Sequence, residues 1–171
     1  MFRSIFIVAL GYLLFSTTAF AGGIGIVDFQ KAINEVKEGK NAKSKIDSMF
    51  SQKRSALQQK EKELKDKFTA YEQQKSLLSP TARQEQEQSL MMMQQQYQQL
   101  AMQAEQEVQQ IYAKEMETLI SKMKDISATL GQEKSLDLIL EATESGIVYK
   151  SPTVMDLTGD LIKRYDAKYG G

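Results

Sequence analysis

Carboxylates are the main side chains through which this sequence could do acid–base or metal chemistry, because it contains no histidine and no cysteine. That composition excludes Cys–His nucleophiles, Ser–His triads and the usual zinc sites. Paired carboxylates such as Glu61 with Glu63, or Glu85 with Glu87, lie two residues apart and diverge on a helix. No phosphate-binding loop of the G-x-x-x-x-G-K-[ST] type occurs. We therefore expect no catalytic residue, no metal, no cofactor and no enzyme activity.

Methionine, aromatic and glutamine side chains offer the chain's other chemistry, which is contact with polypeptides. In residues 84–110, 12 of the 27 residues are glutamine, and three consecutive methionines lie among them. Methionine is common on surfaces that accept many partners, but it also packs as an ordinary helix former. The glutamines fit a neutral wall for a bound chain and an unselected solvated face about equally. Six residues are candidate contacts, with packing between helices as the main alternative for the first two: Phe68, Tyr71, Met91, Met92, Tyr97 and Met102.

These candidates lie on two long predicted helices. Between Lys40 and Leu130 the sequence has one proline, Pro80, and no glycine, which favours helix throughout. Ser79 and Pro80 suit the N-cap and the first helical position, so the chain turns back there. The resulting arms, residues 28–78 and 80–130, are equal in length, as a closed antiparallel hairpin requires.

A seven-residue repeat runs along the first arm through Phe50, Leu57, Leu64, Tyr71 and Leu78. Such a repeat predicts a helix that supercoils left-handedly against a partner. The second seam position is mostly charged or polar, so the arm should bury little surface and should bend. The returning arm carries its own apolar stripe at spacings of three and four residues.

The two arms differ in charge. Residues 37–67 hold ten basic and five acidic residues, whereas residues 80–130 hold four basic and seven acidic ones. We interpret this as mutual support through exposed ion pairs between antiparallel arms, each worth about 0.2–1 kcal/mol. A basic surface for an anionic partner is the weaker interpretation, and no nucleic-acid partner is expected.

Short strand-like runs flank the hairpin at residues 23–27, 136–140 and 146–149, the last two joined by a turn around residues 144–146. Four residues mark where the predicted helices begin, kink or end. They are Asp28 as an N-cap, Gly39 as a weak point for a kink, Gly131 as the stop of the returning arm, and Thr158 as the N-cap of a final helix. That final helix has an apolar side formed by Leu157, Leu161, Ile162 and Tyr165.

The predicted fold is α+β and mostly α: a small β body, residues 22–36 plus 131–171, and a coiled-coil-like hairpin arm, residues 37–130, with its tip near residues 78–81. A body of 56 residues is near the limit for an independent core. Three short strands would also leave open sheet edges. We therefore expect self-association. The candidates for the oligomerisation surface, which could instead only fill the protomer core, are Ile24, Ile26, Val27, Leu138, Leu140, Ile147 and Val148.

The first 21 residues have the pattern of a signal peptide that is cleaved after Ala21. Arg3 supplies the positive charge, residues 5–15 are apolar but too short to span a bilayer comfortably, and residues 19–21 form an A-x-A site. We expect an exported mature chain of net charge −1 (21 basic and 22 acidic residues without Arg3) that folds without disulfides.

The order of these features resembles the Skp (OmpH-like) family of periplasmic chaperones. The residues that carry the resemblance are 25–29 with Gly39 and Lys40, 136–140, 146–149, and 156–158 with 161–163. The resemblance covers essentially the whole mature chain. It implies a periplasmic homotrimer whose three hairpins project as tentacles around a cavity. It also implies an ATP-independent holdase that binds unfolded outer-membrane β-barrel proteins and prevents their aggregation.

The sequence departs from this family in charge. The well-studied members are strongly basic, whereas this mature chain is close to neutral. At most a weak contact with a membrane surface or with lipopolysaccharide is expected. The alternative function is a periplasmic coiled-coil spacer or adaptor with one specific partner, which would bind that partner saturably without suppressing aggregation.

Overall fold

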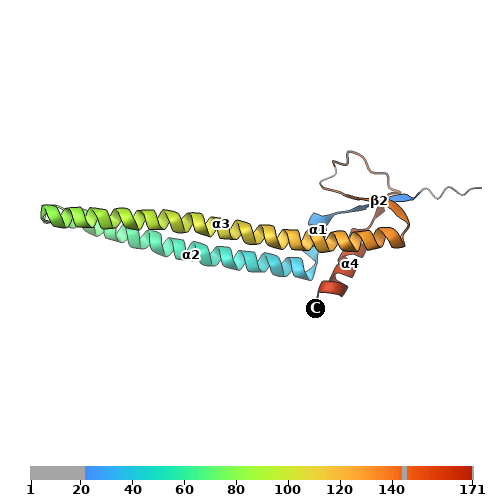
Figure 1. Ribbon diagram of the computed structural model, residues 1–171, viewed down its shortest axis with the longest axis horizontal. Helices are drawn as coiled ribbons and strands as arrows, with labels where there is room; N and C mark the ends of the chain where they lie inside the picture. The colour runs from blue at the N-terminus through green and yellow to red at the C-terminus, as the bar shows by residue number, and fades with distance from the viewer. Residues whose placement is uncertain (1–21, 144–145, 171) are drawn as a thin grey trace, which may run out of the picture.

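A computed structural model of the chain describes residues 22–143 and 146–170. Its elements are β1 (Gly23–Val27), α1 (Phe29–Glu35), α2 (Lys37–Gln74), α3 (Pro80–Glu133), β2 (Leu136–Glu141), β3 (Met155–Asp156) and α4 (Thr158–Tyr169). Helices α2 and α3 run side by side as a long hairpin that projects from a small body made by the other elements (Figure 1). The predicted α+β class, with a β body and a helical arm, is confirmed. The predicted signal peptide lies outside the described residues.

The body contains a parallel sheet with the strand order β2-β1-β3. The predicted strands at 23–27 and 136–140 are confirmed, and β2 extends to Glu141. The strand predicted at 146–149 is wrong, because those residues are irregular and the third strand is β3. Both outer strands run parallel to β1, so the chain after β2 must return along the sheet before it can start β3. Residues 146–149 form part of that return, and most of the turn predicted before them lies outside the described residues.

One face of the sheet packs against the helices. Val27 and Ile139 reach this core from the sheet, and Leu157 reaches it from the start of α4. The other members of the core come from α1 and the residue that follows it, from the body ends of α2 and α3, and from α4. They are Ala32, Ile33, Val36, Ala42, Leu119, Met123, Ile126, Leu130, Leu161 and Tyr165. The hairpin therefore supplies buried side chains to the core of the body. This differs from the prediction that the thin apolar stripe of the arm buries little surface.

Two glycines do not have the roles that the sequence suggested, which were a kink at Gly39 and a helix stop at Gly131. The chain breaks at Val36, between α1 and α2, three residues before the kink predicted at Gly39. Helix α3 continues past Gly131 to Glu133, and the left-handed residue that follows it is Ser135, with a φ of 52°. Both glycines are in buried contacts: a Cβ on Gly39 would meet the Ile33 carbonyl oxygen at 1.9 Å. Close packing, rather than helix termination, explains their presence.

The polar caps are confirmed at two helix starts and wrong at a third. Asp28 accepts a hydrogen bond from the Lys31 amide at 2.7 Å, and Ser79 accepts one from the Ala82 amide at 3.2 Å. Thr158 is the first residue of α4 rather than its N-cap. Its hydroxyl instead accepts the Asp28 amide at 3.0 Å, so it ties the start of α4 to the end of β1. The predicted apolar side of α4 is confirmed: Leu157, Leu161 and Tyr165 are buried, and Ile162 is half-buried.

Ion pairs connect the two arms as the charge pattern predicted. Lys45 pairs with Glu115 at 2.6 Å and Lys53 with Glu107 at 2.5 Å. Near the body, Glu38 pairs with Lys122 at 2.6 Å. Each pair joins a base of α2 to an acid of α3 or the reverse, which fixes the register of the hairpin.

Candidate functional site

Two of the grooves between α2 and α3 have mainly apolar walls. One lies midway along the arm and has a volume of about 590 Å³, with Phe50, Leu57, Tyr97 and Val108 among its walls. The other, of about 730 Å³, lies nearer the tip and is lined by Leu64, Phe68, Tyr71, Leu90 and Met91 among others. Both combine apolar walls with charged rims, which is the composition of a surface for contact with other polypeptides.

Small residues open the middle groove. Ala101 and Ala104 of α3 lie in its lining with Leu57 of α2. Alanine side chains leave space that a larger residue would fill. Leu57 and Ala104 also line a smaller groove of about 380 Å³, whose lining includes Leu100 and Gln103. The same two side chains therefore separate two grooves of the hairpin.

Polar contacts close the tip. The Tyr71 side chain is 4% exposed, and its hydroxyl donates a hydrogen bond to Glu87 across the hairpin. Arg83 donates from Nη2 to the Lys75 carbonyl at 3.1 Å, which satisfies a carbonyl at the end of α2. Burial, together with the hydrogen bond to Glu87, raises the pKa of Tyr71 to about 12. These contacts hold the tip closed at neutral pH.

The structure separates the six predicted contact residues into four groups. Phe68 and Met91 are 55% and 61% exposed and line the tip groove. Half-buried Tyr97 lines the middle groove, whereas Tyr71 packs between the helices and offers almost no surface to a partner. Met92 and Met102 are exposed but are not among the residues that line these two grooves.

Phe50 is a groove residue that the sequence reasoning missed, because it was assigned to the seam. Its side chain is 55% exposed, while Tyr71 in the same repeat is 4% exposed and Leu57 and Leu64 are half-buried. A helix of 3.6 residues per turn drifts by about 20° for each seven residues. Three repeats separate Phe50 from Tyr71, so Phe50 turns toward one face of the hairpin. That drift is the signal that could have identified it.

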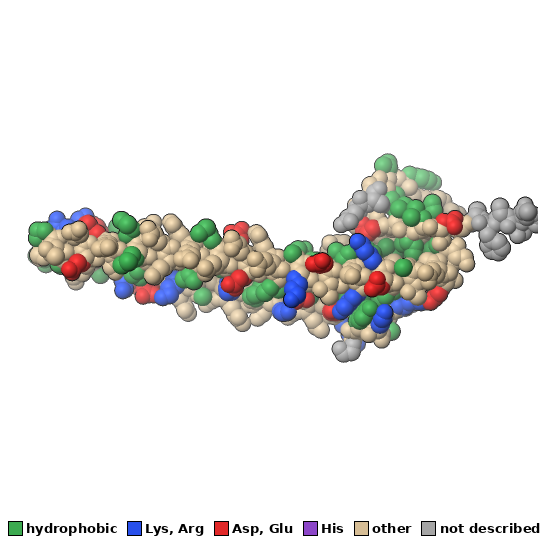
Figure 2. Space-filling view, in the orientation of Figure 1, with side chains coloured by type: hydrophobic (Ala, Val, Ile, Leu, Met, Phe, Trp, Pro, Cys, Tyr) green, Lys and Arg blue, Asp and Glu red, His purple; other side chains and the backbone are tan. Residues whose placement is uncertain are grey.

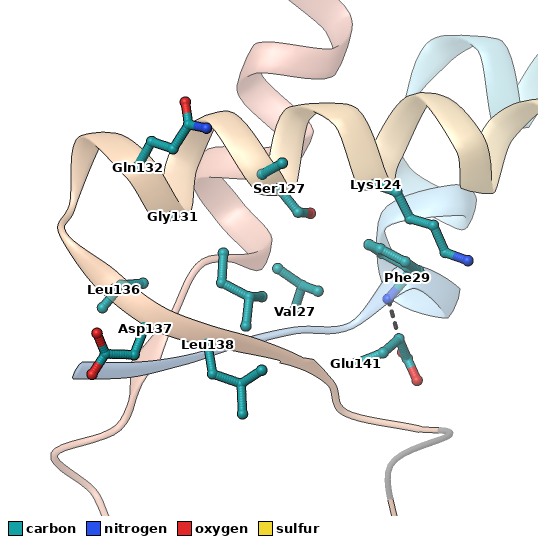
Figure 3. A pocket seen from close by; sticks show the side chains of 12 residues that line it. Val27, Phe29, Lys124, Ser127, Gly131, Gln132, Leu136, Asp137, Leu138 and Glu141 are labelled. Carbon is teal, nitrogen blue, oxygen red and sulfur yellow. Dashed lines mark hydrogen bonds between the residues drawn. The ribbon is translucent and has the colours of Figure 1, made fainter. Parts of the chain in front are cut away.

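The body presents a second apolar surface, on the sheet face that the helices do not cover. In the register of the sheet, Ile24 pairs with Leu138 and Ile26 with Leu140, which places these four side chains on one face. Figure 3 shows Val27 pointing toward α3 and Leu138 pointing away from it. Ile24 and Leu138 are 49% and 47% exposed.

The other predicted body residues divide between core and surface. Ile26 and Val27 are buried, and Leu140 and Ile147 are half-buried. Val148 is fully exposed on the irregular segment after β2. Apolar side chains accordingly gather over the body and recur at intervals along the arm (Figure 2).

A groove of about 430 Å³ lies between α3 and β2 in the body (Figure 3). Its lining includes Lys124 and Ser127 of α3 and Asp137 of β2. The buried Ser127 hydroxyl has no hydrogen-bond partner among the described residues. Glu141 borders the groove and accepts the Phe29 amide at 3.2 Å, which fixes the start of α1. The groove lies beside a sheet edge and is part of the body surface.

A hydrogen-bond network fixes the arm to the body. Glu38, in the first turn of α2, accepts from Lys122 at 2.6 Å and from the Tyr165 hydroxyl at 2.7 Å. Burial opposes the charged form of Glu38, but the hydrogen bonds from Lys122 and Tyr165 outweigh it, so the pKa of this carboxyl lies below its ordinary value. Asp166 of α4 accepts the Lys37 amide at 2.9 Å. The direction of the arm is thereby set by α4.

Within residues 22–143 and 146–170, no group of three or more acidic side chains is arranged to hold a metal ion. None of the helices in that part of the chain is long and apolar enough to cross a membrane. The described part of the chain is thus a grooved helical hairpin on a small sheet, one face of which is apolar and not covered by the helices. The chain belongs to the family described as outer membrane protein (OmpH-like), which it matches over residues 23–165.

A solved structure shares the fold. It is that of an OmpH-like protein from Caulobacter crescentus CB15, described as an outer membrane chaperone. The two chains have a TM-score of 0.76 and 17% sequence identity, over 86% of this chain and 85% of the other. No curated protein matches the sequence.

Proposed function

We propose that the mature chain is an ATP-independent periplasmic holdase. It binds unfolded outer-membrane β-barrel proteins between helical arms and prevents their aggregation. The observation that carries this proposal is the arm itself, because its grooves display half-exposed aromatic and methionine side chains along a solvated hairpin. Family membership and the chaperone description of the Caulobacter protein support it.

Weak contacts spread along an arm suit this task. An unfolded barrel protein exposes apolar segments that aggregate. Separate contacts of low affinity break singly, yet linked contacts retain the client through a high effective concentration. Because the contacts are individually weak, release requires no fuel and occurs when the client finds a more stable destination.

We further propose that the chain acts as a homotrimer, in which three bodies associate through the uncovered sheet face and three arms surround a cavity. Ile24 and Leu138 support this, because they are paired in the register of the sheet and burying two half-exposed aliphatic side chains is favourable. Leu140, Ile147 and Val148 extend the proposed surface. With a net charge near neutral, contact with a membrane surface or lipopolysaccharide is weak.

A light-scattering assay tests the proposed function. A β-barrel protein is diluted from urea with and without residues 22–171, and scattering should fall in the presence of the chain. Unchanged scattering would contradict the proposal, and saturable binding of a single partner without any such effect would favour an adaptor. The double variant Ile24→Glu with Leu138→Glu should prevent trimer formation. The control is Lys40→Glu, at an exposed position of α2, which should leave the trimer intact.

A further inference from the structure

The two arm grooves open on the same side of the hairpin. Glu61 lines both of them, so they are continuous along α2. Phe50 lies in the middle groove and Phe68 in the tip groove, and each is 55% exposed. Their separation of 18 residues is about five turns of helix, so the two rings project from one face of α2. At about 1.5 Å per residue the rings lie roughly 27 Å apart along the arm.

The remaining grooves of the hairpin are more polar. The one that also adjoins Leu57 and Ala104 has several polar side chains in its lining and Leu100 as its exposed large apolar side chain; the polar ones include Lys60, Glu63, Gln103 and Glu107. A further groove near the tip is lined mainly by lysine, glutamine and serine, with Ala70, Tyr71 and Leu90 as its apolar members. Neither holds an exposed phenylalanine or methionine. Among these grooves, the exposed phenylalanine and methionine side chains therefore lie on one side of the hairpin only.

The charges around the apolar grooves are balanced. Four basic and four acidic residues line the two grooves together: Lys53, Arg54, Lys65 and Lys75 with Glu61, Glu72, Glu87 and Glu105. A polyanion such as nucleic acid, or an anionic lipid surface, requires an excess of basic residues. A rim of mixed sign instead complements a polypeptide whose polar groups are uncharged or of both signs.

We propose that this side of the arm, from Phe50 to Phe68, binds one transmembrane strand of an unfolded β-barrel protein in an extended conformation. The inference deepens the proposed holdase function and rests on it. A strand of such a barrel has about 9–11 residues, with apolar side chains at alternate positions. At about 3.3 Å per residue, the distance between the two rings corresponds to roughly eight extended residues. Alternate apolar side chains enter the grooves, and the polar ones between them face the charged rims and water.

This arrangement favours peptides by the order of their apolar residues rather than by their overall amino-acid composition. In an extended segment the alternate side chains all project from one side, so they reach both grooves at once. A segment with the same residues in one apolar block presents them on both sides and fills only part of the surface. The Phe50–Phe68 side of the arm would then be the inner wall of the proposed cavity.

Peptide binding to the full mature chain tests the inference. The probe is a labelled 11-residue peptide with apolar residues at alternate positions and serine or threonine between them, compared with a block-ordered peptide of equal composition. The groove variant combines Phe50→Gln with Phe68→Gln, and the control variant combines Leu77→Gln with Tyr112→Gln, whose side chains are 86% and 55% exposed and line neither apolar groove. Because all four side chains are largely exposed, both variants should fold, which circular dichroism checks.

We expect the alternating peptide to bind the wild type, and the groove variant to lose about tenfold in affinity, equal to about 1.4 kcal/mol. The control variant should bind like the wild type, and the block-ordered peptide should bind about tenfold more weakly. Equal binding of the two peptides, or unchanged binding by the groove variant, would overturn the inference. A photo-crosslinking residue in place of Phe50 or of Phe68 gives a second readout: labelling of alternate peptide positions supports the inference, and labelling without that period contradicts it.

The light-scattering assay separates this inference from the proposed function. If the wild type and the groove variant suppress aggregation equally well, the holdase proposal survives and the strand-binding face does not. If the wild type itself fails to suppress aggregation, the holdase proposal fails and the inference fails with it.

Discussion

The Tyr165 hydroxyl donates a hydrogen bond of 2.7 Å to Glu38, which connects the C-terminal helix to the first turn of α2. Tyr165 is fully buried, and its pKa is raised by burial and by Glu38. Lys122 of α3 donates to the same carboxylate. One carboxylate thus joins α2, α3 and α4 where the arm leaves the body.

Replacing Tyr165 with phenylalanine should destabilise the chain. The change removes a hydrogen bond to a charged group, worth about 1.5–3 kcal/mol, and leaves the ring packed. Urea unfolding followed by circular dichroism measures the loss. Tyr149→Phe is the control, since Tyr149 is 81% exposed and should tolerate the change. Equal midpoints for the two variants would show that the contact does not hold the arm.

Acid should destabilise the body. Hydrogen bonds from Arg164 to Glu133 and from Thr158 to Asp156 lower the pKa of those carboxyls, and Glu38 is lowered as well. Since their folded pKa values lie below the unfolded ones, the unfolded chain binds more protons as pH falls. The stabilisation is complete above the ordinary carboxyl pKa, about 4.3, and is lost as pH falls through the lowered values.

Urea midpoints at pH 7 and pH 3 measure this effect. The midpoint should be lower at pH 3, and the difference should shrink in Glu38→Gln, which has no charge to lose. An equal or higher midpoint at pH 3 would contradict the sign of these pKa shifts.

Alanine should be tolerated at Gly159 and not at Gly39. A Cβ on Gly39 would lie 1.9 Å from the Ile33 carbonyl oxygen, whereas one on Gly159 would meet nothing within 4 Å. We expect Gly39→Ala to cost roughly 1–3 kcal/mol because the backbone must shift. Gly159→Ala should gain about 0.4–1 kcal/mol by restricting the unfolded chain. Thermal unfolding of both variants checks this, and a stable Gly39→Ala would exclude the close approach.

The hydroxyl of Tyr71 should titrate near pH 12 and should depend on Glu87. Glu87→Gln removes the negative charge that opposes ionisation, so the pKa of Tyr71 should fall while burial keeps it above the ordinary value. Carbon-13 NMR of labelled tyrosine follows the titration. Glu85→Gln is the control, because Glu85 is exposed on the same helix, whereas the Tyr71 hydroxyl donates its hydrogen bond to Glu87. An unchanged pKa in Glu87→Gln would show that the tip is open in solution.

Local signals predicted most of the architecture. Ser79 and Pro80 combine a side-chain cap with a fixed backbone angle, so they locate the turn of the hairpin without knowledge of tertiary contacts. Asp28 does the same for α1. The ion pairs between the arms also followed, because the net charge of each arm is a property of its own sequence.

Tertiary contacts decided the rest. Gly131 has the appearance of a helix stop, yet Ile139 packs beside it and the helix continues. The strand-like run at 146–149 does not join the described sheet, because β2 and β3 both run parallel to β1 and the chain between them must return along the sheet. Phe50 leaves the seam through helical drift that a count of sevens does not include. Each error arose where a sequence pattern agreed with a local rule but packing set the outcome.

Sedimentation tests the central claim most directly. Residues 22–171 would be centrifuged alone and then with a β-barrel protein freshly diluted from urea. We predict a trimer that carries the client in a discrete complex remaining in solution. A trimer that leaves the client to aggregate would contradict the holdase function, and a stable folded monomer at low micromolar concentration would contradict the assembly.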